Sequence, residues 1–178
     1  MPGRVLQAAA LLCGLGLLHG VEAASIALVQ VRLPKVDNPY CDVATHIYAN
    51  LPEQATSLQD RTGTPMIVVN SAIVSTKPLY AKFLMAHECC HHKLGHVRRY
   101  YEGLGHLGPQ PFYYIRPQLR QMELDADTCA VEILKLGGEM EAIEAARQAM
   151  FAFGEQPTGA YYPTGIERAE NIARVGKY

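Results

Sequence analysis

Apolar side chains recur along this chain with two different spacings. Short runs rich in Val, Ile and Leu are typical of strands, whereas apolar positions three and four residues apart are typical of helices. The first pattern predicts strands at Ser25–Leu33 and Met66–Asn70, and it allows the second strand to extend over Ser71–Val74. The second pattern predicts helices at Cys41–Leu51, Leu79–Val97, Pro117–Leu136, Glu139–Phe153 and Ile166–Val175.

Polar and turn-forming segments separate these elements. Pro52–Thr64 is polar and ends at a turn signal, and Gly154–Gly165 is rich in turn residues, so both are interpreted as connections. Arg98–Arg116 contains three glycines, two prolines and several aromatic residues, which is typical of a long loop. Two roles for this loop stay open: its tyrosines could wall a substrate cleft, or they could cover the core.

The first residues have the organisation of a secretory signal peptide. Arg4 precedes the apolar run Val5–Leu18, and the small residues around Ala23 fit the pattern for cleavage after that position. The run is shorter than the ~18 apolar residues that a membrane span requires, which disfavours an uncleaved anchor. We therefore expect residues 1–23 to be a signal peptide. Residues 24–178 are then a single exported domain, periplasmic or secreted, without stable membrane insertion after cleavage.

Composition and charge exclude some classes of partner. Hydrophobic residues make up 49% of the chain and charged residues 19%, which is enough apolar material for a real core. The net charge of −1 gives no electrostatic basis for binding nucleic acid or an anionic membrane.

The exported chain keeps four cysteines, Cys41, Cys89, Cys90 and Cys129. An even number of cysteines in an exported protein favours disulfides, and four cysteines allow three pairings. Cys89 and Cys90 are adjacent on a predicted helix and are not expected to bridge each other. Each could bridge to either of the other two, and buried free thiols are the alternative.

The pentapeptide HECCH at residues 87–91 is an HExxH segment late in an apolar run that predicts a helix. Residues four apart share a helix face, so His87 and His91 can present two imidazole nitrogens to one tetrahedral zinc ion. Glu88 lies about 100° further around the helix axis, from where its carboxylate can reach a zinc-bound water. The segment therefore predicts a hydrolytic zinc site in which Glu88 is the general base.

A hydrolytic zinc site usually takes a third protein ligand. Glu123 suits this role because it lies on a separate predicted helix, and Asp127 follows on the same face, where it can accept a hydrogen bond from a ligating imidazole. His92 and His96 lie about 100° and 140° from the ligand face, so neither reaches the same metal unless the helix breaks. His106, in the predicted loop, stays open as an alternative third ligand.

Several motifs together resemble those of the gluzincin metallopeptidases, in particular the HtpX and CAAX-prenyl-endopeptidase type. HECCH at residues 87–91 is followed by ELDAD at residues 123–127, which is similar to the ExxAD element of that family. Met66–Asn70 resembles the family's edge strand, and Pro163–Arg168 resembles its C-terminal proline–arginine element. The resemblance covers roughly residues 60–175.

The resemblance implies an α+β, zincin-like domain, in which a small mixed sheet packs on an active-site helix and a second ligand-bearing helix. It implies one Zn²⁺ per chain, bound by His87, His91 and Glu123, with Asp127 orienting His87.

The chain departs from the family at Tyr162, which stands where the family has a histidine near the active site. A tyrosine hydroxyl can donate to an oxyanion, so Tyr162 or the neighbouring Tyr161 is a candidate replacement, with Arg168 as a second candidate for this stabilisation. A tyrosine of the core is the alternative interpretation of Tyr162.

The predicted function is that of an exported zinc-dependent endopeptidase acting on peptides or unfolded proteins. An extended peptide could add as a strand to an exposed sheet edge beside the site. One alternative is a catalytically degenerate zinc-binding chaperone or protein-interaction module. A second alternative is a metal buffer using the clustered histidines at residues 87–96.

Overall fold

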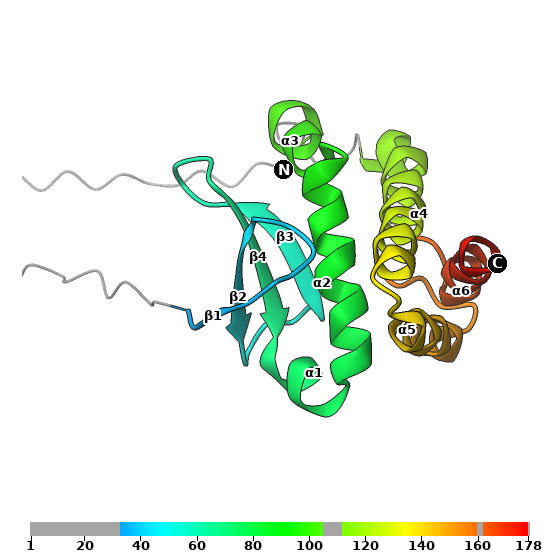
Figure 1. Ribbon diagram of the computed structural model, residues 1–178. Helices are drawn as coiled ribbons and strands as arrows, with labels where there is room; N and C mark the ends of the chain where they lie inside the picture. Colours follow the sequence, from blue (N-terminus) through cyan, green and yellow to red (C-terminus); the bar gives the residue numbers. More distant parts are fainter. Residues whose placement is uncertain (1–32, 105–111, 160–161, 178) are drawn as a thin grey trace, which may run out of the picture. The chain divides into compact units, whose positions relative to one another are not determined.

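A computed structural model describes residues 33–104, 112–159 and 162–177, with side chains left undescribed over 103–115 (Figure 1). Within these ranges the fold is α+β, as predicted, with one mixed four-stranded sheet and six α-helices. The strands are β1 (Lys35–Val36), β2 (Ala44–Tyr48), β3 (Ala55–Gln59) and β4 (Pro65–Asn70). The helices are α1 (Ser71–Thr76), α2 (Pro78–Lys93), α3 (His96–Arg99), α4 (Phe112–Leu136), α5 (Met140–Phe153) and α6 (Gly165–Gly176).

The helix α2 lies between the sheet and the other long helices (Figure 1). One side of α2 packs on β3 and β4, and the other side packs on α4 and α5, with α6 behind them. Because apolar neighbours cover both sides, most of α2 is buried, including Phe83, Ala86 and Cys90. Such a central helix can hold charged side chains only if they pair with one another.

The sheet has the strand order β1-β2-β4-β3, with β2 parallel to β4 and the outer pairs antiparallel. β4 buries Ile67, Val68 and Val69 because it has a strand on either side. The expectation that Met66–Asn70 is an edge strand is therefore wrong. The edge beside α2 is formed by β3.

Two segments before β4 also differ from the prediction. Cys41–Leu51 is not a helix, because its centre forms β2, whose Thr45 and Ile47 are β-branched residues that favour strands. Pro52–Thr64 is more than a connection, because it contains β3. β3 shows little apolar alternation because all its residues are half-buried at an edge, where pairing with β4 defines the strand.

The segment after β4 turns at once into a helix. Asn70 caps α1 by accepting a hydrogen bond from the backbone N–H of Ala72, so Ser71–Val74 does not extend the strand. Pro78 then begins α2, one residue before the predicted start, in the first-turn position where proline is favoured.

The predicted helix Leu79–Val97 ends early. α2 stops at Lys93, and Gly95 adopts a φ of 71°, a left-handed conformation that glycine accepts without steric cost. The chain then forms α3 and a π-helical turn at Tyr100–Leu104, so the first part of the predicted loop Arg98–Arg116 is helical.

Residues 105–111, including His106, lie outside the described residues, as do residues 1–32 with the predicted signal peptide and most of the strand Ser25–Leu33. α4 begins at Phe112, five residues before the predicted start, and keeps Pro117 inside the helix. A proline inside a helix removes one backbone donor and its ring crowds the carbonyl four residues earlier, so α4 continues through Pro117 at a local cost.

The helices α4, α5 and α6 confirm the remaining predicted helices. Their apolar faces meet α2 in the main core, where Leu134, Met150 and Ile172 are buried. Thr164 caps α6 in a reciprocal arrangement with Glu167, which explains why α6 begins beside Gly165. None of the helices within the described residues is long and apolar enough to cross a membrane.

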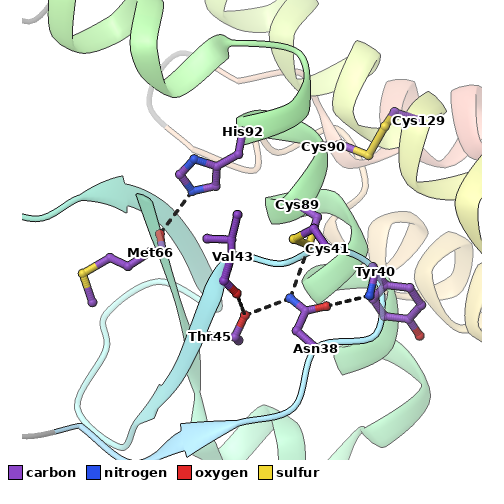
Figure 2. The surroundings of a disulfide bond; sticks show 10 residues. All are labelled: Asn38, Tyr40, Cys41, Val43, Thr45, Met66, Cys89, Cys90, His92 and Cys129. Atoms are coloured by element: carbon purple, nitrogen blue, oxygen red, sulfur yellow. Dashed lines mark hydrogen bonds between the residues drawn. A yellow bond between two sulfur atoms is a disulfide. The ribbon is translucent and has the colours of Figure 1, made fainter. Parts of the chain in front are cut away.

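All four cysteines outside the N-terminal segment form disulfides. Cys41 pairs with Cys89, and Cys90 pairs with Cys129, which removes the free-thiol alternative (Figure 2). The two bonds leave α2 on different sides: the first reaches the segment before β2, and the second reaches α4. Adjacent residues of one helix thereby attach it to both of its neighbouring layers.

Candidate metal centre

Three predicted ligands meet in the structure. His87 and His91 lie one turn apart on α2, and Glu123 lies on α4, with one ligand atom from each within 4.8 Å of the others. The Nε2 atoms of His87 and His91 are 3.0 Å apart. Oε2 of Glu123 lies 3.5 Å from Nε2 of His87, and Oε1 of Glu123 lies 3.4 Å from Nε2 of His91. This group can hold a metal ion. Two imidazole nitrogens and a carboxylate oxygen suit several divalent transition metals.

A buried ion pair supports the ligands from behind. Arg168 of α6 donates two hydrogen bonds to Asp127, from Nε at 2.8 Å and from Nη2 at 2.6 Å. Asp127 in turn lies 2.9 Å from Nδ1 of His87, and Nη1 of Arg168 lies 3.4 Å from Glu123. Since Asp127 is fully buried and Arg168 nearly so, these contacts hold His87 and Glu123 in fixed orientations.

The charges within this cluster are balanced. Burial opposes the charged form of His87, but hydrogen bonds to Asp127 and Glu123 outweigh it and raise the pKa of His87 to about 10. Burial and the charge of His87 lower the pKa of His91 to about 3, so this imidazole stays neutral. Two carboxylates thus face two cations, His87 and Arg168. A divalent cation bound here would take the place of the His87 proton.

The two carboxylates remain ionised despite their burial. Burial alone would raise the pKa of Glu123, but the hydrogen bond and charge of His87 lower it to about 2. For Asp127 the opposing influence is mainly the Arg168 guanidinium, which with His87 lowers the pKa to about 2. Both groups are therefore acceptors at neutral pH, as a ligand and its supporting carboxylate must be.

Glu88 has a partner on the sheet. Its carboxyl group is buried and interacts with the side chain of Ser57 on β3. Burial raises the pKa of Glu88, although His87 and Ser57 act in the opposite direction. A carboxylate with a raised pKa beside a metal-binding group is suited to accepting a proton.

A cavity of about 760 Å³ opens over these groups. His87, Glu88, His91, Glu123, Tyr162 and Arg168 all contribute to its wall. Asp127 is the one predicted site residue that does not line it and lies behind the ligands. The structure therefore brings together residues that are as far apart in the sequence as His87 and Arg168.

The sheet edge and the segment after α2 also contribute to the cavity wall. β3 contributes Ala55–Leu58, and the π-helical turn contributes Tyr100 and Tyr101. These two tyrosines belong to the segment for which a cleft wall was one of the two predicted roles. Tyr162 also lines the cavity, where partial burial and the negative charges of Glu123 and Glu88 raise the pKa of its hydroxyl. Tyr161 lies outside the described residues.

One neighbour of the ligands was not predicted. His96 of α3 is buried, and its Nδ1 lies 3.2 Å from Nδ1 of His91. The signal that could have found it is Gly95, which ends the helix directly before this histidine.

Comparison of the chain with protein-family models, curated proteins and solved structures returned no match. The resemblance to the gluzincins therefore rests on the motifs themselves. The geometry alone indicates what the site can do: it can bind a metal ion at the wall of an open cavity, with a buried carboxylate beside it.

Proposed function

We propose that this protein is a zinc-dependent endopeptidase with a zincin-like active site. The observation that carries the proposal is the convergence of His87, His91 and Glu123, with Glu88 beside them, on one cavity. A purely structural metal site is normally closed by four protein ligands. Here three protein ligands open onto a cavity, which suits a catalytic site that leaves a position for water.

Zinc is favoured by the donor set. Two neutral imidazoles and one carboxylate are the ligands of several hydrolytic zinc enzymes. A zinc ion bound there would polarise the scissile carbonyl and lower the pKa of a water molecule. Asp127 accepts a hydrogen bond from Nδ1 of His87, which directs Nε2 of that ring toward the metal position.

Glu88 is the general base in this proposal. Its carboxylate takes the proton of the attacking water and passes it to the leaving amine. Its burial and its raised pKa favour this exchange of a proton. Tyr162, whose ring lines the cavity, is the candidate donor to the oxyanion of the transition state.

The sequence suggested Arg168 as a group that stabilises the oxyanion, but in this proposal it has a different role. Its guanidinium is bound to Asp127 and approaches Glu123, so its donors are largely engaged. We infer that Arg168 positions the carboxylates that hold and orient the ligands, and that its influence on the reaction passes through them.

The substrate is proposed to be an extended peptide that adds to the edge strand β3. Among the described residues β4 is the only strand beside β3, so the other edge of β3 has no strand partner there, and four β3 residues line the cavity. Backbone hydrogen bonds to such an edge hold a peptide independently of its side chains. Ser57, which interacts with Glu88, places this edge next to the general base.

One observation favours the alternative of a metal-binding interaction module. Arg168 and His87 already neutralise Asp127 and Glu123, so these two carboxylates need no metal ion for charge balance. Such a cluster could persist in a protein that has lost catalysis and keeps only the fold. The two functions differ in whether Glu88 is required for any measurable reaction.

The test measures bound zinc and casein hydrolysis for the wild type and for Glu88→Gln. We expect one zinc per chain in both proteins, with hydrolysis lowered about 10²–10⁴-fold in the variant because the proton acceptor is lost. Glu132→Gln, an exposed position on α4, is the matched control and should retain full activity. Undiminished hydrolysis by Glu88→Gln would refute the mechanism, and zinc binding without hydrolysis by the wild type would favour the interaction module.

A further inference from the structure

The two imidazole ligands have different neighbours at their second ring nitrogen. Nδ1 of His87 lies against a carboxylate, that of Asp127. Nδ1 of His91 lies 3.2 Å from Nδ1 of His96, and this is the one hydrogen-bond partner of that nitrogen among the residues that the structure describes. The two rings meet edge to face, with centroids 5.1 Å apart and an interplanar angle of 68°.

The break in the helix brings His96 to this place. In a continuous helix, a residue five positions after His91 would point about 140° away from it. Gly95 instead adopts a left-handed conformation, and α3 starts a new helical axis at His96. The ring of His96 is buried as a result, although its residue begins a short surface helix.

The nitrogen with which His91 binds metal determines which ring nitrogens of His91 and His96 carry a proton. His91 directs Nε2 at His87 and Glu123, so this nitrogen must be unprotonated when it binds a metal ion. A neutral imidazole then carries its proton on Nδ1, and that proton needs an acceptor in a buried site. Nδ1 of His96 is an acceptor at the required distance, provided that His96 carries its own proton on Nε2.

We propose that His96 is a positioning residue for the metal site, which accepts a hydrogen bond from His91 and fixes the ring orientation and tautomer in which His91 binds metal. The proposal rests on the metal site of the proposed function, and it is independent of whether that site hydrolyses peptides. His96 would do for His91 what Asp127 does for His87.

The geometry argues against His96 as a fourth metal ligand. Its Nδ1 faces the nitrogen of His91 that lies on the far side of the ring from the ligand atom. The group that can share one ion accordingly contains His87, His91 and Glu123 without His96. A ligand set of three is also what leaves room for water or substrate.

The experiment measures the zinc dissociation constant of the full chain by competition with a chelator. His96→Leu removes the acceptor at similar volume, and we expect zinc binding to weaken about 10–100-fold, the usual cost of losing such a partner. His96→Asn places an amide oxygen near the position of Nδ1 and should stay within about threefold of the wild type. His92→Leu is the control, because His92 is bonded to the Met66 carbonyl on the sheet side.

A second measurement separates positioning from a general effect on folding. In ¹⁵N-resolved spectra of the zinc-loaded wild type, the Nδ1 proton of His91 should be visible and protected from exchange. This signal should be lost in His96→Leu and kept in His96→Asn, while the unfolding midpoints of the metal-free proteins remain alike.

The outcomes distinguish the inference from the proposed function. Zinc binding by His96→Leu as tight as in the wild type would overturn the positioning role alone. Equal weakening in His96→Leu and His96→Asn would also overturn it, because a ligand or a packing role would then explain the loss. A wild type that binds no zinc would overturn both the inference and the proposed function.

Discussion

The two sides of α2 carry different kinds of interaction. The side facing α4 and α6 holds the ion pair of Asp127 and Arg168 behind His87. The side facing the sheet holds an apolar cluster in which Cys89 packs on Ile67 and Val69. A disulfide attaches each side to its neighbour, Cys90 to α4 and Cys89 to the segment before β2 (Figure 2).

This difference places the residues that could bind a metal ion and the residues proposed for catalysis on different sides of α2. The ligands and their supports depend on the packing of α2 against α4 and of α4 against α6, because Glu123 comes from α4 and Arg168 from α6. The proposed general base and the proposed peptide-binding edge depend on the packing of α2 against the sheet, where Ser57 interacts with Glu88. Changes on one side should therefore affect metal affinity, and changes on the other side should affect catalysis or stability alone.

The largest effect is expected from removing the buried cation. Arg168→Met leaves Asp127 and Glu123 with one positive partner instead of two, and Asp127 is fully buried. Breaking a buried pair on one side typically lowers the free energy of unfolding by about 3–5 kcal/mol. Urea unfolding followed by circular dichroism measures this loss.

The control for that substitution is Arg147→Met. Arg147 forms an exposed pair with Glu144 on α5, and surface pairs of this kind contribute little. If Arg168→Met were no more destabilising than Arg147→Met, the ion pair would not support the site in the way described.

The two disulfides allow a matched comparison of the two sides. Cys90→Ala with Cys129→Ala releases α2 from the helix that bears Glu123, and it should lower the free energy of unfolding by about 2–4 kcal/mol and weaken zinc binding. Cys41→Ala with Cys89→Ala should cost a similar free energy, since the sequence separations of 48 and 39 residues are comparable, and leave zinc binding unchanged.

Both double variants are measured by urea unfolding and by zinc competition in the same buffer. The informative quantity is the ratio of their zinc dissociation constants, because the loss of stability is expected in both. Equal zinc affinities for the two variants would show that the ligand helices stay aligned without the Cys90–Cys129 bond.

The smallest effect is expected at Tyr162, whose bond to α4 is made by its backbone carbonyl, which accepts from Arg120, and not by its hydroxyl. Tyr162→Phe removes only the hydroxyl group, so zinc binding and stability should match the wild type. If the hydroxyl donates to the oxyanion, kcat should fall about 10–100-fold with little change in KM, as the loss of one hydrogen bond made in the transition state predicts. An unchanged kcat would show that the Tyr162 hydroxyl does not stabilise the transition state and that Tyr162 only lines the cavity.

Much of the site could be predicted because it depends on local helical geometry. His87 and His91 share a helix face by their spacing of four, and so do Glu123 and Asp127. The structure indeed has both pairs on helices, with the second pair facing the first. Elements that depend on distant partners were harder to predict: β3 is a strand because β4 lies beside it.

The pairing of the helices also decided which side chains complete the site. Arg168 was a candidate for stabilising the oxyanion; it lines the cavity, and its hydrogen bonds to Asp127 were not predicted. His96 was expected to point away, and it meets His91 because the chain leaves the helix at Gly95. The spacing of residues along the chain predicts neither contact, because each contact joins residues of two different helices.

The sequence by itself determined the local chemistry of this protein: two imidazoles and a carboxylate on one turn of α2, two carboxylates on one turn of α4, and cysteines adjacent to the ligands. Hydrogen bonds and side-chain spacing within a helix depend on neighbours a few residues apart, so these features are readable in one dimension. Only the tertiary structure decided which cysteines pair, which strand forms the edge beside the cavity, and which groups support each imidazole. Those choices depend on how whole elements pack. The hydrophobic effect that drives this packing is proportional to the apolar area buried and is non-directional, so the spacing of residues along the chain does not specify which elements meet.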